Sequence, residues 1–146
     1  MCRLMIDTNI LLDTLDSQRP ESEEALELLS RCNGCGELGM VSSHSLQDVY
    51  YVSRKMHGER WARDAIGHLM GLVTIAPVDD EVCDHAMRSD EPDFEDGVVR
   101  ACAELNGAGY IVTRDSGAFA NCKIRSVTAS EYLRIADANG RKAPVA

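Results

Sequence analysis

The 146-residue sequence lacks a long hydrophobic run, internal repeats, low-complexity segments and linkers. No apolar stretch approaches the roughly 18 residues that a membrane span requires. The apolar residues of the N-terminal MCRLMIDTNILL are interrupted by Asp7 and Asn9, so this segment lacks the continuous apolar core of a signal peptide. We therefore expect a soluble, cytoplasmic protein with a single domain.

Basic residues are also scarce, since 15 Lys and Arg face 24 Asp and Glu, for a formal net charge of −9. A chain this acidic does not bind nucleic acid through a diffuse positive surface. A polyanionic ligand would need bound cations or a local basic patch to invert the potential. The run SRKMHGERWAR (residues 53–63) is a candidate patch, although a solvated helix face is the simpler explanation. The negative charge also favours a partner with a basic segment.

The six cysteines do not form a zinc-binding pattern. Cys32 and Cys35 make a single C-x-x-C, and a zinc ribbon needs a second pair at matching spacing. This pair follows a predicted helix and lies in an Asn-Gly turn, whereas a thioredoxin-like pair opens a helix. We expect most of the cysteines to be small buried side chains in a reducing compartment.

Short apolar segments alternate with helical patterns along the whole chain. We predict strands at 3–6, 37–43, 73–78, 110–113 and 123–128, and helices from about 9 and at 20–32, 44–57, 59–72, 80–89, 92–107 and 129–138. The strand segments are mostly apolar throughout rather than alternating, which is typical of a parallel sheet covered on both faces. The prediction is a three-layer α/β/α domain with a central, mainly parallel sheet over residues 1–136, followed by a flexible tail at 137–146.

Two of the predicted helices carry clear apolar stripes. Leu26 belongs to the predicted buried face of helix 20–32, and Phe94 and Leu105 belong to that of helix 92–107. We expect all three side chains to be covered by the sheet.

Acidic residues follow two of the predicted strands. Asp7 follows the first strand and Asp115 follows strand 110–113. Ligand sites in parallel sheets lie beyond the carboxyl ends of the strands, so both carboxylates are expected at one edge. Asp48 lies in a helix with Tyr51 and Val52 one turn later, which predicts an apolar face for it. Asp96 lies at the start of helix 92–107.

Each of these acids also has a structural explanation. Asp7 fits the cap of the helix that begins near Asn9, and Asp115 in TRDSG fits a turn. Asp93 has the spacing of a capping residue, which we take as its main role. Asp48 is the hardest to explain in this way, because a half-buried carboxylate inside a helix is costly unless it is paired or binds metal.

Taken together, the carboxylates predict a metal site. Converging carboxylates repel one another and raise each other's pKa unless a cation compensates. Their oxygen atoms suit Mg²⁺ or Mn²⁺, and such ions promote phosphodiester hydrolysis by water. His44, one turn before Asp48, is expected to be a hydrogen-bond partner rather than a metal ligand.

Four segments of the chain together resemble the PIN domain, and in particular its small bacterial branch, which includes the toxins of toxin–antitoxin pairs. These segments are MIDTNILLDTL, SLQDVYYVSRK, DFEDGVVRACAELNGAGYIVTRD and IRSVTASEYL, and the resemblance spans residues 3–135. It implies a flavodoxin-like three-layer fold and a Mg²⁺- or Mn²⁺-dependent ribonuclease that leaves a 5′-phosphate. By position, the acidic quartet corresponds to Asp7, Asp48, Asp96 and Asp115, supported by Asn9 and Thr113, with Asp93 as an extra acid of this branch.

The sequence departs from the PIN pattern at two positions. The second acid is usually Glu, and Asp48 is one methylene shorter, which puts its direct contact with metal in doubt. Gly97 stands where a small helix-former is usual, at a cost of about 1 kcal/mol of helix stability. A toxin role does not follow from the sequence of this chain and would require a small antitoxin partner, whose basic or apolar segment would occupy the acidic cleft. PIN-like domains often form homodimers, and no residue pattern here decides that point.

Two other functions are compatible with the sequence. One is a PIN-like binding module with weak catalysis that acts through RNA or a protein partner, which the shorter Asp48 and the acidic surface favour. The other is a receiver-like phosphoacceptor domain, which predicts adjacent acids after the first strand and a lysine after a late strand. The sequence has Asp7-Thr8-Asn9 and Thr113-Arg114-Asp115 at these places, so this second function fits poorly.

Overall fold

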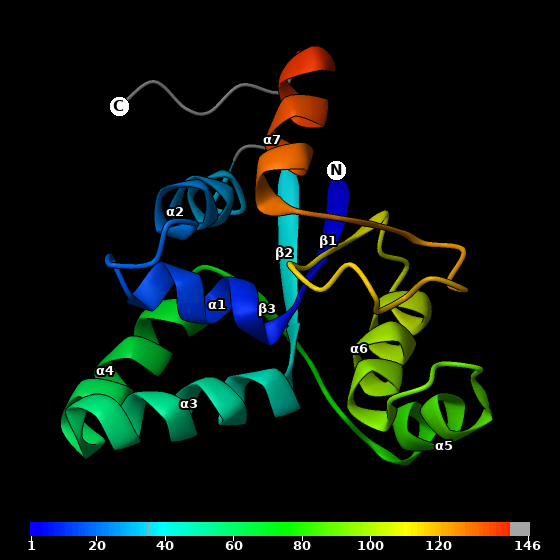
Figure 1. The fold of residues 1–146 in the computed structure, drawn as a ribbon, viewed down its shortest axis with the longest axis horizontal. Coiled ribbons are helices and arrows are strands. Elements are labelled where there is room, and N and C mark those ends of the chain that lie inside the picture. Colours follow the sequence, from blue (N-terminus) through cyan, green and yellow to red (C-terminus); the bar gives the residue numbers. More distant parts are fainter. Residues whose placement is uncertain (35, 141–146) are drawn as a thin grey trace.

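The computed structural model describes residues 1–34 and 36–140, and its centre is a five-stranded sheet in the order β3-β2-β1-β4-β5 (Figure 1). Every neighbouring pair of strands in the sheet is parallel, as predicted. The strands are β1 (Cys2–Ile6), β2 (Glu37–Ser42), β3 (Thr74–Ala76), β4 (Tyr110–Val112) and β5 (Arg125–Val127).

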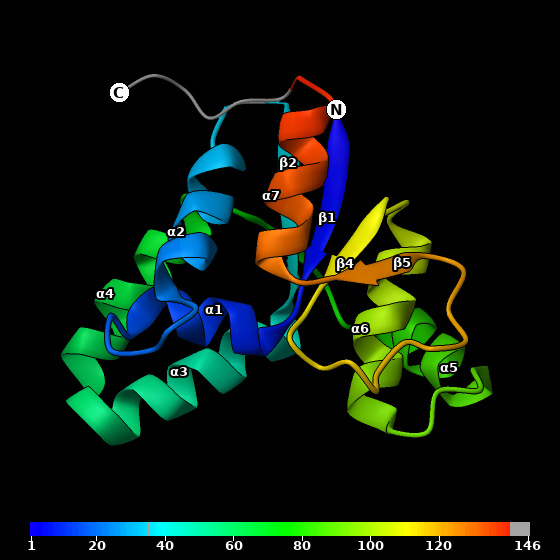
Figure 2. The same cartoon turned by 45° about the horizontal axis from the view of Figure 1, so that its top comes forward.

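The helices cover both faces of the sheet. They are α1 (Thr8–Leu15), α2 (Ser22–Arg31), α3 (Ser43–His57), α4 (Glu59–Met70), α5 (Asp80–Arg88), α6 (Phe94–Leu105) and α7 (Ala129–Ala138). Figures 1 and 2 show α5 and α6 on one side of the sheet and the other helices on the opposite side. The predicted three-layer α/β/α architecture is therefore confirmed.

The central strand β1 explains why the strand segments lack polar alternation. Leu4 and Ile6 pack into the core beneath α1, α2 and α7, whereas Met5 packs into the core beneath α5 and α6. All three side chains have no solvent exposure. Since both faces of the strand are buried, apolar residues are required at every position.

The strand order places a topological switch point between β1 and β4. From β1 the chain builds outward through β2 and β3, then returns to the other side of β1 to form β4 and β5. Ile6 is in register with Val112, and the Asp7 N–H donates a 2.9 Å hydrogen bond to the Val112 carbonyl. The residues that follow the two strands therefore leave the sheet side by side. This is where ligand sites form in open parallel sheets.

Several details differ from the sequence predictions. Leu26, Phe94 and Leu105 are exposed by 51%, 49% and 41%, so these three burial predictions were wrong. In α2 the apolar contact is made by Leu28, which is fully buried. A Cβ at Gly97 would meet Ala86 at ordinary contact distances, so packing does not require glycine there.

The C-terminal end of the expected domain and the C-x-x-C pair lie partly outside the described residues. Helix α7 ends at Ala138, where the predicted helix at 129–138 ends. Residues 141–146 of the predicted tail lie outside the described part of the chain, as does Cys35. Burial raises the pKa of the Cys32 thiol to about 12, as expected for a packing residue. Among the described helices, none has the length and apolarity needed to cross a membrane.

Candidate active site

Asp7 forms the base of a cleft at the switch point. It is 8% exposed and caps α1, because its Oδ1 accepts a 2.8 Å hydrogen bond from the Thr8 N–H. Its Oδ2 accepts hydrogen bonds from Thr113 Oγ1 at 2.8 Å and from Asn9 Nδ2 at 3.3 Å. The capping role considered for Asp7 is thus present, and the same carboxylate also reaches the end of β4.

Asn9 and Thr113 join the two strand ends around this carboxylate. Asn9 Nδ2 also lies 3.4 Å from Thr113 Oγ1, and Asn9 Oδ1 accepts a 3.2 Å hydrogen bond from the Arg114 N–H. Thr113 Oγ1 in turn accepts a 3.0 Å hydrogen bond from the Asp115 N–H. Both residues contact the carboxylate that they were expected to support.

Asp115 holds the start of the loop that follows β4. Its Oδ1 accepts hydrogen bonds from the N–H groups of Gly117 at 2.9 Å and Ala118 at 3.2 Å. The predicted turn role is therefore real. Because these bonds engage Oδ1 of Asp115, Oδ2 is the oxygen that can bind a ligand in the cleft.

The start of α6 contributes a second pair of acids. Asp93 caps this helix, since its Oδ1 accepts a 3.0 Å hydrogen bond from the Asp96 N–H. Asp96 lines the cleft, together with the more exposed Glu95. Asp93 does not line it, so its observed role is the cap.

Asp48 lies at the rim of the cleft on α3. Its side chain is 44% exposed, and its Oδ2 lies 3.5 Å from His44 Nε2, one turn earlier on the same helix. His44 Nε2 is also 3.9 Å from Glu95 Oε1. The apolar face predicted for this part of α3 is less complete than expected, because Tyr51 is 58% exposed.

One cleft of about 300 Å³ brings the predicted quartet together. Its lining includes Asp7, Asn9, Asp48, Asp96 and Asp115, contributed by α1, α3, α6 and the segments after β1 and β4. As the side chains stand, no three His, Cys, Asp or Glu within residues 1–34 and 36–140 form a ready-made ion-binding group. The carboxylates therefore share a cleft but, as they stand, do not converge on one point.

The protonation of the cleft carboxylates reflects their crowding. Burial raises the pKa of Asp7, and hydrogen bonds from Thr113, Thr8 and Asn9 only partly offset this, while the charge of Asp115 raises it further. The pKa of Asp96 is raised to about 6, first by burial and then by the neighbouring charges of Asp93, Asp7 and Asp115. Negative charge thus accumulates here without compensation, and a cation would relieve it.

The donor set fits a hard divalent cation. Apart from His44 at the rim, the groups that could bind an ion in the cleft are carboxylate, hydroxyl and amide oxygens. Oxygen ligands with room for water suit Mg²⁺ or Mn²⁺ better than zinc. On the chemistry of its donors, the cleft can accommodate such an ion.

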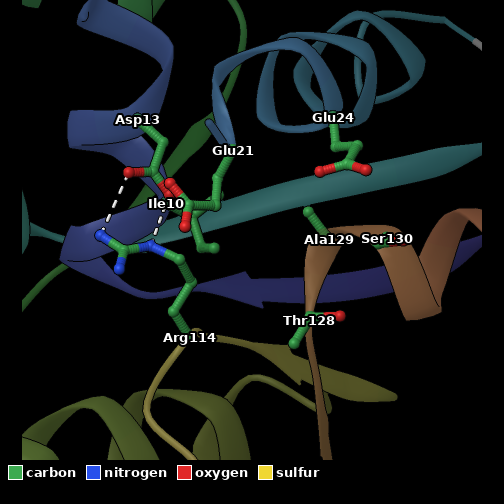
Figure 3. A pocket seen from close by; sticks show the side chains of 8 residues that line it. All are labelled: Ile10, Asp13, Glu21, Glu24, Arg114, Thr128, Ala129 and Ser130. Carbon is green, nitrogen blue, oxygen red and sulfur yellow. Dashed lines mark hydrogen bonds and ion pairs between the residues drawn. The ribbon is translucent and has the colours of Figure 1, made fainter. Parts of the chain in front are cut away.

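Two buried carboxylates near the cleft make contacts that were not predicted from the sequence. Asp13 is wholly buried on α1 and binds the Arg114 guanidinium through Nε at 2.7 Å and Nη2 at 3.1 Å (Figure 3). It also accepts a 3.1 Å hydrogen bond from Arg19. Glu91, whose side chain is 2% exposed, accepts a 3.0 Å hydrogen bond from the Phe119 N–H and so holds the loop after Asp115. The position of Asp13 within the apolar run ILLDTL was the one sequence feature that could have predicted its burial.

The parallel sheet between two layers of helices, with a carboxylate-lined cleft at its switch point, defines a small α/β domain of the PIN type. The sequence matches the PIN domain family over residues 3–117, and the chain belongs to this family. No protein with a curated description matches the sequence.

Solved structures of bacterial toxins have the same fold. VapC20 of Mycobacterium tuberculosis, described as a toxin that cleaves the sarcin-ricin loop, is 19% identical with a TM-score of 0.68, over 86% of this chain and 98% of that one. A toxin–antitoxin complex from Klebsiella pneumoniae is 23% identical with a TM-score of 0.64, over 88% and 98%. VapBC-1 of nontypeable Haemophilus influenzae is 13% identical with a TM-score of 0.66, over 89% and 99%. At these identities the likeness concerns the fold.

Proposed function

We propose that this protein is a metal-dependent ribonuclease that acts as the toxin of a toxin–antitoxin pair. The observation that carries the proposal is the cleft at the switch point, in which carboxylates from four segments gather with no Lys or Arg among the described residues that line it. Membership of the PIN family and the fold shared with VapC toxins support the same function.

The proposed ion is Mg²⁺ or Mn²⁺, held by Asp7, Asp96 and Asp115, with Asp48 completing the set from the rim. Such an ion lowers the pKa of water and neutralises charge that develops on a phosphodiester. Hydrolysis that releases the ribose 3′-oxygen leaves a 5′-phosphate, the product that the PIN resemblance implies.

The surrounding side chains hold these carboxylates in place before a ligand binds. Thr113, Asn9 and the Thr8 N–H fix both oxygens of Asp7, so that its orientation is set in advance. The Asp115 carboxylate is fixed through Oδ1 by the loop N–H groups. Preorganised ligands bind without the cost of ordering flexible side chains.

The protein partners are part of this proposal. Several structural neighbours are VapBC complexes, and one from Rickettsia felis is bound to a DNA fragment from the promoter. We propose an antitoxin partner whose basic segment matches the acidic cleft of this chain. A homodimer and a cytoplasmic location belong to the same proposal.

The decisive test compares RNA cleavage by the wild type and by Asp7→Asn in Mn²⁺. We expect the wild type to cleave RNA and Asp7→Asn to lose cleavage while its far-ultraviolet circular dichroism is unchanged. Asp64→Asn, an exposed position on α4 outside the cleft, is the matched control and should cleave like the wild type. Cleavage by Asp7→Asn at the wild-type rate would show that this assignment of the site is wrong.

The catalytically weak binding module is the second candidate. It is favoured by the half-exposed Asp48 in place of a longer Glu and by the open arrangement of the acids. Calorimetric titration with Mn²⁺ alongside the cleavage assay separates the two functions. The module predicts weak ion binding and no turnover, whereas the ribonuclease predicts both saturable binding and turnover.

A further inference from the structure

A second pocket, of about 380 Å³, lies between α1, α2 and the start of α7 (Figure 3). Its lining includes Ile10, Glu21, Glu24, Arg114, Thr128 and Ser130. The volume falls within the range of about 300–1,000 Å³ that is typical of small-molecule sites. None of the predicted site residues lies in this pocket.

A hollow of about 220 Å³ adjoins both the pocket and the carboxylate cleft. Asp115 lines the cleft and the hollow. Arg114 and Thr128 line both the hollow and the pocket. The three hollows thus follow one another along the surface by way of Asp115 and Arg114, in the order in which an extended single strand with one phosphate in the cleft would meet them.

Arg114 is held rigidly at the entrance to this pocket. Its Nε and Nη2 bind the wholly buried Asp13, as Figure 3 shows, so the plane of the guanidinium is fixed. Its Nη1 makes no hydrogen bond within the part of the chain that the structure describes. Among the described residues that line the cleft, the hollow and the pocket, Arg114 is the only Lys or Arg. Its free edge suits a phosphate oxygen.

The far wall of the pocket offers hydrogen-bond acceptors beside apolar surface. Figure 3 shows the Glu24 carboxylate opposite Ala129, and the Glu21 carboxylate on the side of Asp13 and Arg114. Carboxylates accept hydrogen bonds from the amino groups of bases, and unpaired RNA bases are read on such edges. Ile10 and Ala129 add apolar surface against which a base can pack.

We propose that this pocket binds one unpaired nucleotide of the RNA strand that flanks the scissile phosphodiester. In this arrangement Arg114 contacts the phosphate of that nucleotide, and Glu21 and Glu24 accept hydrogen bonds from the amino group of its base. The pocket therefore favours a base with an exocyclic amino group over uracil. This inference rests on the proposed ribonuclease function and adds a source of sequence preference to it.

A basic peptide is the competing occupant, because Glu21 and Glu24 are acidic. Asp13 offsets the charge of Arg114, so charge alone does not decide between the two occupants. The hollow that adjoins both the pocket and the cleft favours the strand that is cut there. The two occupants are separated by the following test.

The test measures binding of two five-nucleotide RNAs by NMR, with a metal chelator present so that cleavage does not interfere. One RNA contains only uridine, and the other has a single central cytidine, which replaces a carbonyl with an amino group. We expect the cytidine RNA to bind several-fold more tightly and to shift the backbone amide signals of Glu24 and Ser130. In the double variant Glu21→Ala/Glu24→Ala, which removes both acceptors, this preference should disappear, whereas Glu23→Ala, an exposed neighbour outside the pocket, should retain it.

Arg114→Gln provides an independent readout. Loss of one phosphate contact should weaken both RNAs about tenfold and reduce the slope of log K against log salt concentration by about 0.7. Equal binding of the two RNAs by the wild type, or an unchanged preference in the double variant, would overturn the pocket assignment. So would pocket signals that respond to an arginine-rich peptide and not to RNA.

The outcomes distinguish this inference from the proposed function. If the cytidine preference is present but no RNA is cleaved in Mn²⁺, the ribonuclease proposal fails and the nucleotide pocket stands. If RNA is cleaved with no cytidine preference, the pocket assignment fails and the ribonuclease proposal stands.

Discussion

The Thr113 hydroxyl donates a 2.8 Å hydrogen bond to Asp7 Oδ2 and so connects the ends of two adjacent strands that are far apart in the sequence. Thr113 is 4% exposed, so the bond is shielded from water. It opposes the rise in the Asp7 pKa that burial causes. A buried carboxylate can thus remain ready to bind a cation at the base of the cleft.

Replacement of Thr113 by Val should remove the hydrogen bond between the two strand ends while nearly preserving the volume of the side chain. The variant removes a donor to Asp7 and an acceptor for the Asp115 N–H, which should lower the free energy of unfolding by about 1–3 kcal/mol. The Asp7 pKa should rise, and Mn²⁺ binding should weaken most below neutral pH. Urea unfolding and Mn²⁺ calorimetry measure the two effects. Thr113→Ser keeps the hydroxyl and should resemble the wild type, and unaltered Mn²⁺ affinity in Thr113→Val would contradict this role.

Asp13→Asn should be strongly destabilising although Asp13 lies outside the cleft. Asp13 is fully buried and accepts charge-assisted hydrogen bonds from Arg114 and Arg19. Their loss should reduce the free energy of unfolding by about 2–3 kcal/mol, measured by urea denaturation. Asp16→Asn removes only a longer and more exposed contact with Arg19, and should change stability by less than about 0.5 kcal/mol. Equal effects of the two substitutions would contradict the structural role of Asp13.

Stability in the absence of divalent ions should fall as the pH rises from about 4 to about 7. The pKa of Asp96 is about 6 in the folded protein, above the ordinary value of 3.8, so in this range the folded state holds protons that the unfolded state releases. Asp96→Asn removes this carboxyl and with it this loss of stability. The melting temperature of Asp96→Asn minus that of the wild type should therefore increase as the pH rises from about 4 to about 7. Addition of Mg²⁺ at pH 7 should raise the melting temperature of the wild type more than that of Asp96→Asn. A constant difference between the two proteins at all pH values would refute the raised pKa.

Asp48→Glu should strengthen the proposed metal site. The Asp48 carboxylate is half exposed at the rim beside His44, and one more methylene would extend it further into the cleft. We expect several-fold tighter Mn²⁺ binding and faster RNA cleavage, whereas Asp48→Asn should weaken both. If Asp48→Glu binds Mn²⁺ less tightly than the wild type, the contact with His44 is the more important role of Asp48.

Much of the fold follows from local signals in the sequence. The bounds of α7 match the predicted helix at 129–138, and Asp93 caps α6 as expected, because caps depend on residues a few positions apart. The exposure of Phe94 and Leu105 was not predictable in this way. A period of 3.6 residues defines the stripe of α6, but tertiary packing decides how far along the helix that stripe is covered.

In the candidate site, too, some features follow from local sequence and others depend on tertiary packing. Asp7 and Asp115 each follow an apolar strand, which predicts that both lie at the carboxyl edge of the sheet. That they lie side by side depends on the pairing of β1 with β4, which no local pattern specifies. The contact between Asp13 and Arg114, 101 residues apart, depends on the same pairing and was not predicted.

The most direct test of the metal-dependent account is a crystal structure of the wild-type protein in Mn²⁺, with the ion located by its anomalous scattering. The account predicts an anomalous peak in the cleft that is coordinated by Asp7, Asp96 and Asp115 and lies within reach of Asp48 directly or through water. If a crystal saturated with Mn²⁺ shows no anomalous peak in this cleft, or shows the ion bound only elsewhere on the molecule, the account is contradicted.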